Sequence, residues 1–111
     1  MSGVQQILVA RLRDLLDGVG AVREVPMFGG RAFMLDDRMV VSAKQSGGLL
    51  VRVPPERHAE LLSRPGAAQA TIGADRTMGV GWIEVSHDDI SEDADLEFWV
   101  DLAVTHRAAQ A

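Results

Sequence analysis

Residues 24–53 read EVPMFGGRAFMLDDRMVVSAKQSGGLLVRV, and this stretch decides the fold of the chain. Its Met27-Phe28-Gly29-Gly30 segment interrupts the pattern, and three short segments with strand character follow, at residues 31–35, 38–43 and 48–53. Glycine adopts backbone angles with φ > 0 and allows close approach, so the glycine pair predicts a tight turn that enters a sheet. The stretch therefore indicates a fold and contains no catalytic motif.

The composition is that of an ordinary globular chain. Of its 111 residues, 47% are hydrophobic and 24% are charged, which fits one folded domain over residues 1–111 and argues against disorder. The absence of cysteine excludes disulfides and thiol chemistry and makes reducing cytoplasm the expected location. Because the sequence shows neither a secretory signal nor a long apolar run, we expect no membrane contact.

The charge of the chain argues against direct nucleic-acid binding. Eleven Lys and Arg residues face 16 Asp and Glu residues, which gives a formal net charge of −5. The basic residues are scattered along the sequence and form no basic run. A phosphate backbone is bound mainly through clustered basic side chains, so we expect no direct nucleic-acid binding.

Three helices are predicted, near the start, in the middle and at the end of the chain. Apolar residues recur at three- and four-residue spacings over residues 4–19, and Gly18 and Gly20 end this helix. Pro55 can open a short helix that runs to Leu62, because the first helical position needs no N–H donor. A third apolar stripe begins near Asp93 and continues to about residue 107.

The segments between the helices have strand character. Apolar and polar positions alternate with period two in most of them, which is typical of strands. The expected strands are residues 22–25, 31–35, 38–43, 48–53, a weak one near 70–72, and 82–85. We expect an α+β fold, in which one layer of helices covers an antiparallel β-sheet.

Alternation along the strands divides the apolar residues into two faces. One face is predicted to contain Ala32, Met34, Met39, Val41, Leu49 and Val51. The opposite face is predicted to contain Phe33, Leu35, Val40 and Leu50. The second face is too apolar to be fully solvated, so a crossing helix or a second copy of the chain should cover it. We predict a homodimer that buries this face.

No catalytic, cofactor or metal site is predicted. Ser86-His87-Asp88 contains the residue types of a catalytic triad, but neighbouring strand residues point to opposite faces, and a polar turn is the preferred interpretation. The three histidines, His58, His87 and His106, show no metal-ligand spacing and are expected to be solvated. The acidic stretch from Asp88 to Asp101 fits a solvated helix N-terminus, with a weak divalent-ion site as the alternative.

The Gly-Gly turn has a structural and a functional interpretation. Turn geometry explains it without a ligand, because strands follow and the fingerprint of a phosphate-binding loop is missing. The functional alternative is a rim for a protein partner, since Met, aromatic and Arg residues are enriched in interfaces. This candidate partner-binding rim consists of Met27, Phe28, Gly29, Gly30 and Arg31. Three further large side chains, Met78, Trp82 and Trp99, are expected in the core.

Residues from about 14 to 104 resemble the N-terminal domain of the TfoX/Sxy family, named for bacterial competence regulators. The resemblance depends on the order and spacing of several short motifs. They are Met27-Phe28-Gly29-Gly30, Phe33-Met34-Leu35, Met39-Val40-Val41, residues 48–53, Arg64-Pro65-Gly66, Met78 before Gly81-Trp82, and Leu96 before Trp99-Val100. The resemblance implies an α+β fold similar to the small dimeric secretion chaperones, and it brings no catalytic residues with it.

The named regulators carry a second, C-terminal helical domain, and the present sequence ends at Ala111. The resemblance therefore implies a stand-alone N-terminal domain. We expect a non-enzymatic cytoplasmic interaction or regulatory module, linked to transcription through a protein partner and without a cofactor. The alternative is a small-molecule-binding domain or a minor enzyme with a pocket between sheet and helices.

Overall fold

The alternating strand segments form an antiparallel sheet in a computed structural model, which describes residues 1–27, 29–73 and 75–110. Six strands are hydrogen-bonded in the order β1-β2-β3-β4-β8-β5, and β6 and β7 form a separate two-stranded hairpin. The strands are β1 (Val22–Met27), β2 (Gly30–Leu35), β3 (Arg38–Ala43), β4 (Leu49–Arg52), β5 (Ala67–Gln69), β6 (Thr71–Ile72), β7 (Arg76–Thr77) and β8 (Trp82–Val85). The helices are α1 (Gly3–Leu16), α2 (His58–Leu61) and α3 (Asp93–Ala109), with 3₁₀ turns η1 (Pro55–Arg57) and η2 (His87–Ile90).

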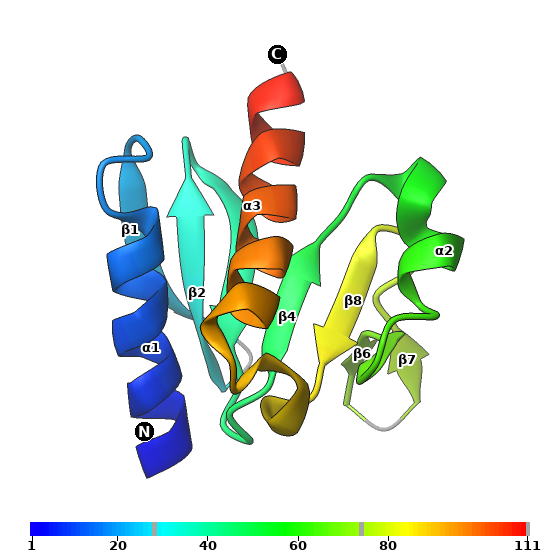
Figure 1. Cartoon of the computed structure of the whole chain (residues 1–111), viewed down its shortest axis with the longest axis horizontal. Helices are drawn as coiled ribbons and strands as arrows, with labels where there is room; N and C mark the ends of the chain where they lie inside the picture. Colours follow the sequence, from blue (N-terminus) through cyan, green and yellow to red (C-terminus); the bar gives the residue numbers. More distant parts are fainter. Residues whose placement is uncertain (28, 74, 111) are drawn as a thin grey trace.

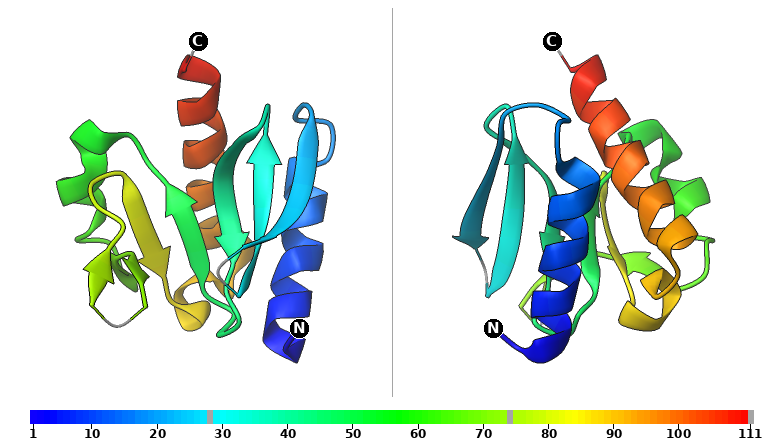
Figure 2. Two further views of the ribbon diagram at one scale, coloured as in Figure 1. Left: turned by 180° about the vertical axis from the view of Figure 1, so that it is seen from behind. Right: turned by 60° about the vertical axis from the view of Figure 1, so that its left-hand side comes forward.

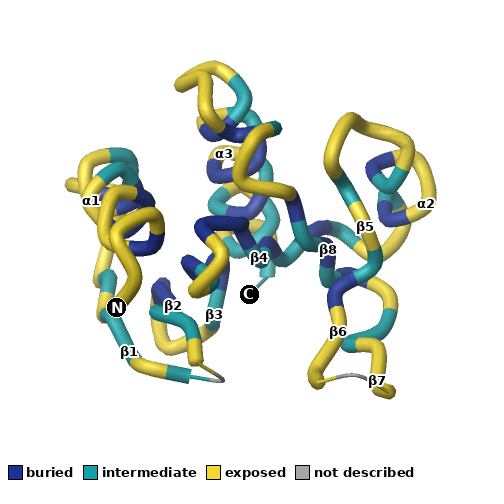
Figure 3. The backbone as a smooth tube through the Cα atoms, turned by 90° about the horizontal axis from the view of Figure 1, so that it is seen from below, coloured by how far each residue is buried: buried dark blue, intermediate teal, exposed yellow. Residues whose placement is uncertain are grey.

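The helices cover only one face of the sheet. Helices α1 and α3 lie against this face, and α2 lies near the β8–β5 edge (Figure 1). Seen from behind, the opposite face carries none of the helices of the described residues (Figure 2). On that side β1 and the β6–β7 hairpin extend away from the helices at the two ends of the sheet (Figure 3). The predicted α+β fold, with its three helices on an antiparallel sheet, is confirmed.

A row of apolar side chains across four strands builds the core under the helices. Phe33 pairs with Val41, Val41 with Val51, and Val51 with Ile83. All four side chains are almost completely buried. Directly paired residues point to the same face, so this row fixes which side of each strand meets the helices. Burial of each such side chain contributes about 1.5–3 kcal/mol to stability.

The predicted division into two faces is wrong for β2, Met39 and Val40. Met39 was predicted on the face of Val41 and Val51 but lies on the opposite, helix-free side, paired with Met34 beyond a shift in the pairing. Phe33 and Leu35 lie in the helix-side core, at 1% and 5% exposure, because β2 is offset by one residue from the predicted pairing. A shift of one residue exchanges the two faces of a strand. Val40 also joins this core, because a bulge lies where the pairing shifts between Phe33 and Met34. Helices, and not a second chain, therefore cover these three residues, and only Leu50 of the predicted dimer face lies on the helix-free side.

The weak strand expected near residues 70–72 is present as β6, whereas β5 and β7 were not predicted. The β6–β7 hairpin has two residues in each strand, and all four are exposed, so no alternation of apolar side chains marks it. Helix α1 ends at Leu16, earlier than the predicted end, because Asp17 takes an extended conformation. Within the described residues, no helix combines the length and the apolar character needed to cross a membrane.

A tight turn joins β2 to β3 without glycine. Asp36 and Asp37 both have positive φ, at 50° and 66°, as the two central residues of a type I′ hairpin turn do. Helix α3 supports this turn through Arg107, whose Nε donates to Leu35 O at 3.0 Å and whose Nη2 donates to Asp36 O at 3.1 Å. These bonds tie the end of the chain to the hairpin and offset part of the cost of two left-handed residues.

We predict that Asp37→Gly stabilises the protein. Glycine removes the Cβ that disfavours positive φ, and the exposed Arg23–Asp37 ion pair that is lost contributes little. A gain of about 0.5–1 kcal/mol would raise the melting temperature by several degrees, as measured by circular dichroism. As the matched control, Asp101→Gly within α3 should lower it, because glycine weakens a helix by a similar amount. A variant Asp37→Gly that melts at or below wild type would contradict the explanation.

Candidate functional site

The helix-free face of the sheet carries a hollow. It has a volume of about 420 Å³ and lies between the β1–β2 turn and the β6–β7 hairpin. Its apolar lining consists of Met27, Met39, Leu50, Ile72 and Met78. Its polar side chains are Ser42, Lys44, Gln45, Ser46, Thr71 and Glu84. We call this hollow the groove.

Strand pairing places the floor of the groove. Ser42 of β3 pairs with Leu50 of β4, and Leu50 pairs with Glu84 of β8. These residues alternate with the buried core row, so their side chains point away from the helices. The groove is therefore the direct consequence of a sheet whose second face has no helix on it.

The two opposite charges in the groove neutralise each other. Lys44 Nζ lies 2.8 Å from Glu84 Oε2. The other carboxylate oxygen of Glu84 accepts a hydrogen bond from the backbone N–H of Thr71 at 3.0 Å. The carboxylate thus connects the β3–β4 turn to the β6–β7 hairpin and leaves the groove without net charge.

A buried histidine fixes the base of the hairpin. His58 of α2 accepts a hydrogen bond from Gly81 N at Nδ1 (2.9 Å), so its Nε2 carries the proton and donates to Gln69 Oε1 at 2.8 Å. Gln69 Nε2 in turn donates to Gly79 O at 2.9 Å. His58 is only 6% exposed, so the predicted solvated histidine is wrong here. Sequence reasoning missed this network because its members are distant along the chain.

The N-terminus of α1 fixes the other end of the groove. Gln5 is buried, and its Nε2 donates to Ala43 O at 2.9 Å and to Gly29 O at 3.4 Å. Ser2 caps the helix by accepting from Gln5 N, and its hydroxyl donates to Gln45 O at 2.6 Å. Both the β1–β2 turn and the β3–β4 turn are therefore held by the first turn of α1.

The predicted partner-binding rim is divided by the structure. Met27, Gly29 and Gly30 line the groove. Arg31 does not; its Nε lies 3.8 Å from Glu24 Oε1, and its side chain borders a neighbouring hollow of about 370 Å³. Phe28 lies outside the described residues. Whether these residues bind a partner stays a prediction.

Two of the three large residues expected in the core lie on the helix-free side or at its border. Met78 is half-buried and lines the groove. Trp82 pairs with Arg52 across β4 and β8, and the Arg52 guanidinium lies 5.0 Å from the centre of its ring. Strict alternation along β8 would have predicted the Trp82 side chain on the helix-free side, because Trp82 directly precedes the core residue Ile83. Only Trp99 is buried as expected, at 2% exposure.

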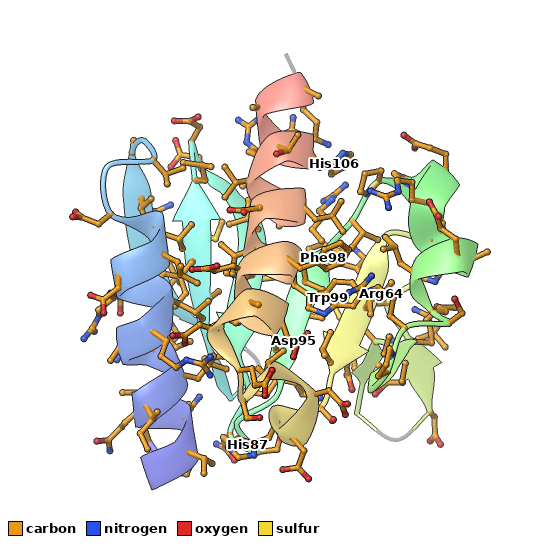
Figure 4. All side chains as sticks on the ribbon, in the orientation of Figure 1. Arg64, His87, Asp95, Phe98, Trp99 and His106 are labelled. Atoms are coloured by element: carbon orange, nitrogen blue, oxygen red, sulfur yellow. The ribbon has the colours of Figure 1, made fainter. Side chains whose placement is uncertain are left out.

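The helix side holds aromatic and polar contacts of structural character. The Arg64 guanidinium lies 3.7 Å from the centre of the Phe98 ring and connects the segment after α2 to α3 (Figure 4). The Ser86 hydroxyl donates to Asp89 Oδ2, and His87 Nδ1 contacts Asp88 at 3.2 Å, so these residues form a polar turn. Among the described residues, no three His, Cys, Asp or Glu side chains are grouped as metal ligands.

Burial perturbs one histidine on α3. His106 Nε2 is buried without a hydrogen-bond partner among the described residues. Burial lowers the pKa of His106 from its usual value of about 6.5, and the Arg52 charge lowers it further, while Glu56 acts in the opposite direction. The folded state therefore disfavours the protonated ring.

This lowered pKa predicts a pH-dependent stability. The unfolded state binds more protons than the folded state below about pH 6.5, so stability is full above that pH and falls as the pH drops toward the folded pKa of His106. We expect the difference in melting temperature between pH 7.5 and pH 5.5 to shrink in His106→Leu. The exposed His87→Leu serves as the control and should keep the wild-type difference. Equal differences in all three proteins would refute the assignment.

The two glycines of the β1–β2 turn are required for different reasons. Gly29 has φ of 77°, where a side chain costs about 1–2 kcal/mol. Gly30 has no such angle, but a Cβ there would lie 2.8 Å from Ser42 Oγ and 3.0 Å from Ala43 O. Glycine at position 30 thus makes room beside the groove floor.

We predict that Gly29→Ala and Gly30→Ala each lower the melting temperature by several degrees. Gly3→Ala is the control, because a Cβ at Gly3 meets nothing within 4 Å and lies in α1. It should leave the melting temperature unchanged or raise it, since alanine favours a helix more than glycine does. If both turn variants melt like wild type, neither the backbone angle nor the contact constrains this turn.

Comparison with known proteins supports a family assignment. The family model described as the TfoX N-terminal domain matches residues 14–107. A search of the curated proteins gives no significant match. The match covers all six strands of the main sheet, the β6–β7 hairpin and most of α3.

Proposed function

Because the chain belongs to the TfoX N-terminal domain family, we propose that it is a non-enzymatic regulatory module that binds a protein partner on the helix-free face of its sheet. The observation that supports this proposal is the methionine-lined groove on that face. Methionine is flexible and polarizable, and it suits surfaces that adapt to a partner. The five apolar side chains of its lining are accompanied by six polar ones, which can fix the orientation of a partner.

The charges of the groove favour binding over catalysis. Lys44 and Glu84 are engaged with each other, and Glu84 also holds the Thr71 N–H. Acid–base catalysis needs a group that can exchange a proton with a substrate, whereas these groups support the walls. The alternative, a ligand-binding domain or minor enzyme, places its pocket between sheet and helices, and the groove lies on the other side.

We place this module in the cytoplasm and expect its link to transcription to pass through the partner. The cysteine-free composition suits a reducing compartment. The net charge of −5 disfavours direct contact with DNA. Self-association, which the sequence predicted through Leu50 and three residues that lie in the core, would use this same face and is distinguished by the experiment below.

Site-specific photo-crosslinking in cells of the native organism tests this proposal. Ile72 lines the groove and is 40% exposed, whereas Ile7 lies on α1 and is 64% exposed. We expect p-benzoylphenylalanine at position 72 to crosslink one protein, and the same group at position 7 to give no such product. Leu50→Glu should abolish the crosslink, because it places a charge in the apolar floor.

The mass of the crosslinked product identifies the partner. A product of twice 12.0 kDa is a second copy of the chain and would support the homodimer in place of a different protein. Equal crosslinking from both positions, or a product that Leu50→Glu does not affect, would refute the helix-free face as the binding surface.

A further inference from the structure

The methionines of the chain are gathered on the helix-free side of the sheet. Of the five methionines, Met27, Met39 and Met78 line the groove. Met34 pairs directly with Met39 and follows the core residue Phe33, so its side chain also points away from the helices. Four thioethers therefore lie on the side of the sheet that we assign to a partner.

This distribution differs from the usual place of methionine, which is among the residues most often buried in protein cores. The buried apolar core of the described residues contains no methionine. The four methionines on the helix-free side are only half-buried, and Met1 is 60% exposed. Part of each side chain is thus open to small molecules in solution, and the core under the helices does not depend on any of them.

The thioethers are also the only sulfur groups of the chain, because it contains no cysteine. Hydrogen peroxide converts a thioether to a sulfoxide by transferring one oxygen atom. The sulfur lone pair forms the S–O bond, the O–O bond breaks, and the proton of the transferred hydroxyl passes to the departing hydroxide, which leaves as water. The sulfur loses two electrons and the peroxide gains them. Methionine sulfoxide reductases return the thioether.

A sulfoxide changes what the groove offers to a partner. The reaction turns a flexible apolar side chain into a polar one with a strong hydrogen-bond acceptor. A partner that packs against this side chain would bury the new oxygen without a donor, which is unfavourable. The oxidised groove is therefore expected to bind the same partner more weakly, while the core on the other side of the sheet keeps its packing.

We propose that Met27, Met39 and Met78 form a reversible oxidation site for hydrogen peroxide, and that their oxidation releases the partner from the groove. This inference rests on the proposed function and specifies how its site is regulated. Met34 lies on the same side of the sheet but is not among the residues that line the groove. It therefore provides a matched control.

Peptide mapping by mass spectrometry tests the modification site without a partner. After treatment of the full chain with hydrogen peroxide, we expect Met27, Met39 and Met78 each to gain the mass of one oxygen atom. The melting temperature should stay within a few degrees of the untreated protein, because no core side chain changes. Oxidation of the exposed Met1 alone, or unfolding that accompanies oxidation of the groove, would overturn the proposal.

Crosslinking from position 72 tests the effect on the partner. Purified protein with p-benzoylphenylalanine at this position is oxidised, mixed with an extract of cells of the native organism and irradiated. We expect about 10-fold less crosslinked product than from the untreated protein. Treatment of the oxidised protein with both methionine sulfoxide reductases should restore the product, since each enzyme reduces one epimer of the sulfoxide.

Leucine variants assign the effect to the groove. The triple variant Met27→Leu, Met39→Leu, Met78→Leu should give the crosslinked product with and without peroxide, because leucine has a similar volume and no sulfur. Met34→Leu should lose the product after oxidation, as the wild type does. The recovery by the reductases is measured on the wild-type groove and does not depend on the folding of the triple variant.

The outcomes distinguish this inference from the proposed function. Undiminished crosslinking after the three groove methionines are oxidised overturns the inference alone. Loss of the product from the triple variant on addition of peroxide, or a loss that the reductases do not reverse, also overturns it, because the sensitive group then lies elsewhere. Absence of the product from the untreated protein refutes the proposed function, and the inference falls with it.

Discussion

The structure depends on one constraint: only one face of its six-stranded sheet is covered by helices. The row from Phe33 to Ile83 must lie under α1 and α3, because exposing these side chains to water would cost several kcal/mol in total. This requirement fixes the register of β2, β3, β4 and β8 together. The opposite side chains are then placed by alternation, with no freedom to choose their face.

The features that the sequence predicted are local along the chain. Helix periodicity and the hairpin around Asp36 and Asp37 depend on neighbouring residues, and both were predicted. The face assignment failed because it depends on how β2 is aligned with β3 and β4, which no single strand determines. The bulge that brings Val40 into the core also depends on how two strands are aligned, since a bulge exists only between paired strands. Strands β5 and β7 were missed because they have three and two residues, too few to show an alternating pattern.

The candidate site shows the same difference between features that are local along the chain and features that depend on strand pairing. The Gly-Gly turn was singled out from the sequence, and two of its glycines do line the groove. Lys44 and Glu84 are forty positions apart in the sequence, so only the sheet brings their charges together.

The hydrogen bonds from Arg107 to the β2–β3 turn have a consequence for folding during synthesis. Arg107 and the Leu35 carbonyl that it binds are separated by 72 positions. During synthesis, α1 and the early strands leave the ribosome long before α3 does, and α1 alone can cover part of their apolar face until α3 arrives. Contacts of such large sequence separation slow folding, because a long loop must close before they form. The nascent hairpin therefore passes through a period in which part of its apolar face is exposed to water, and α3 ends that period.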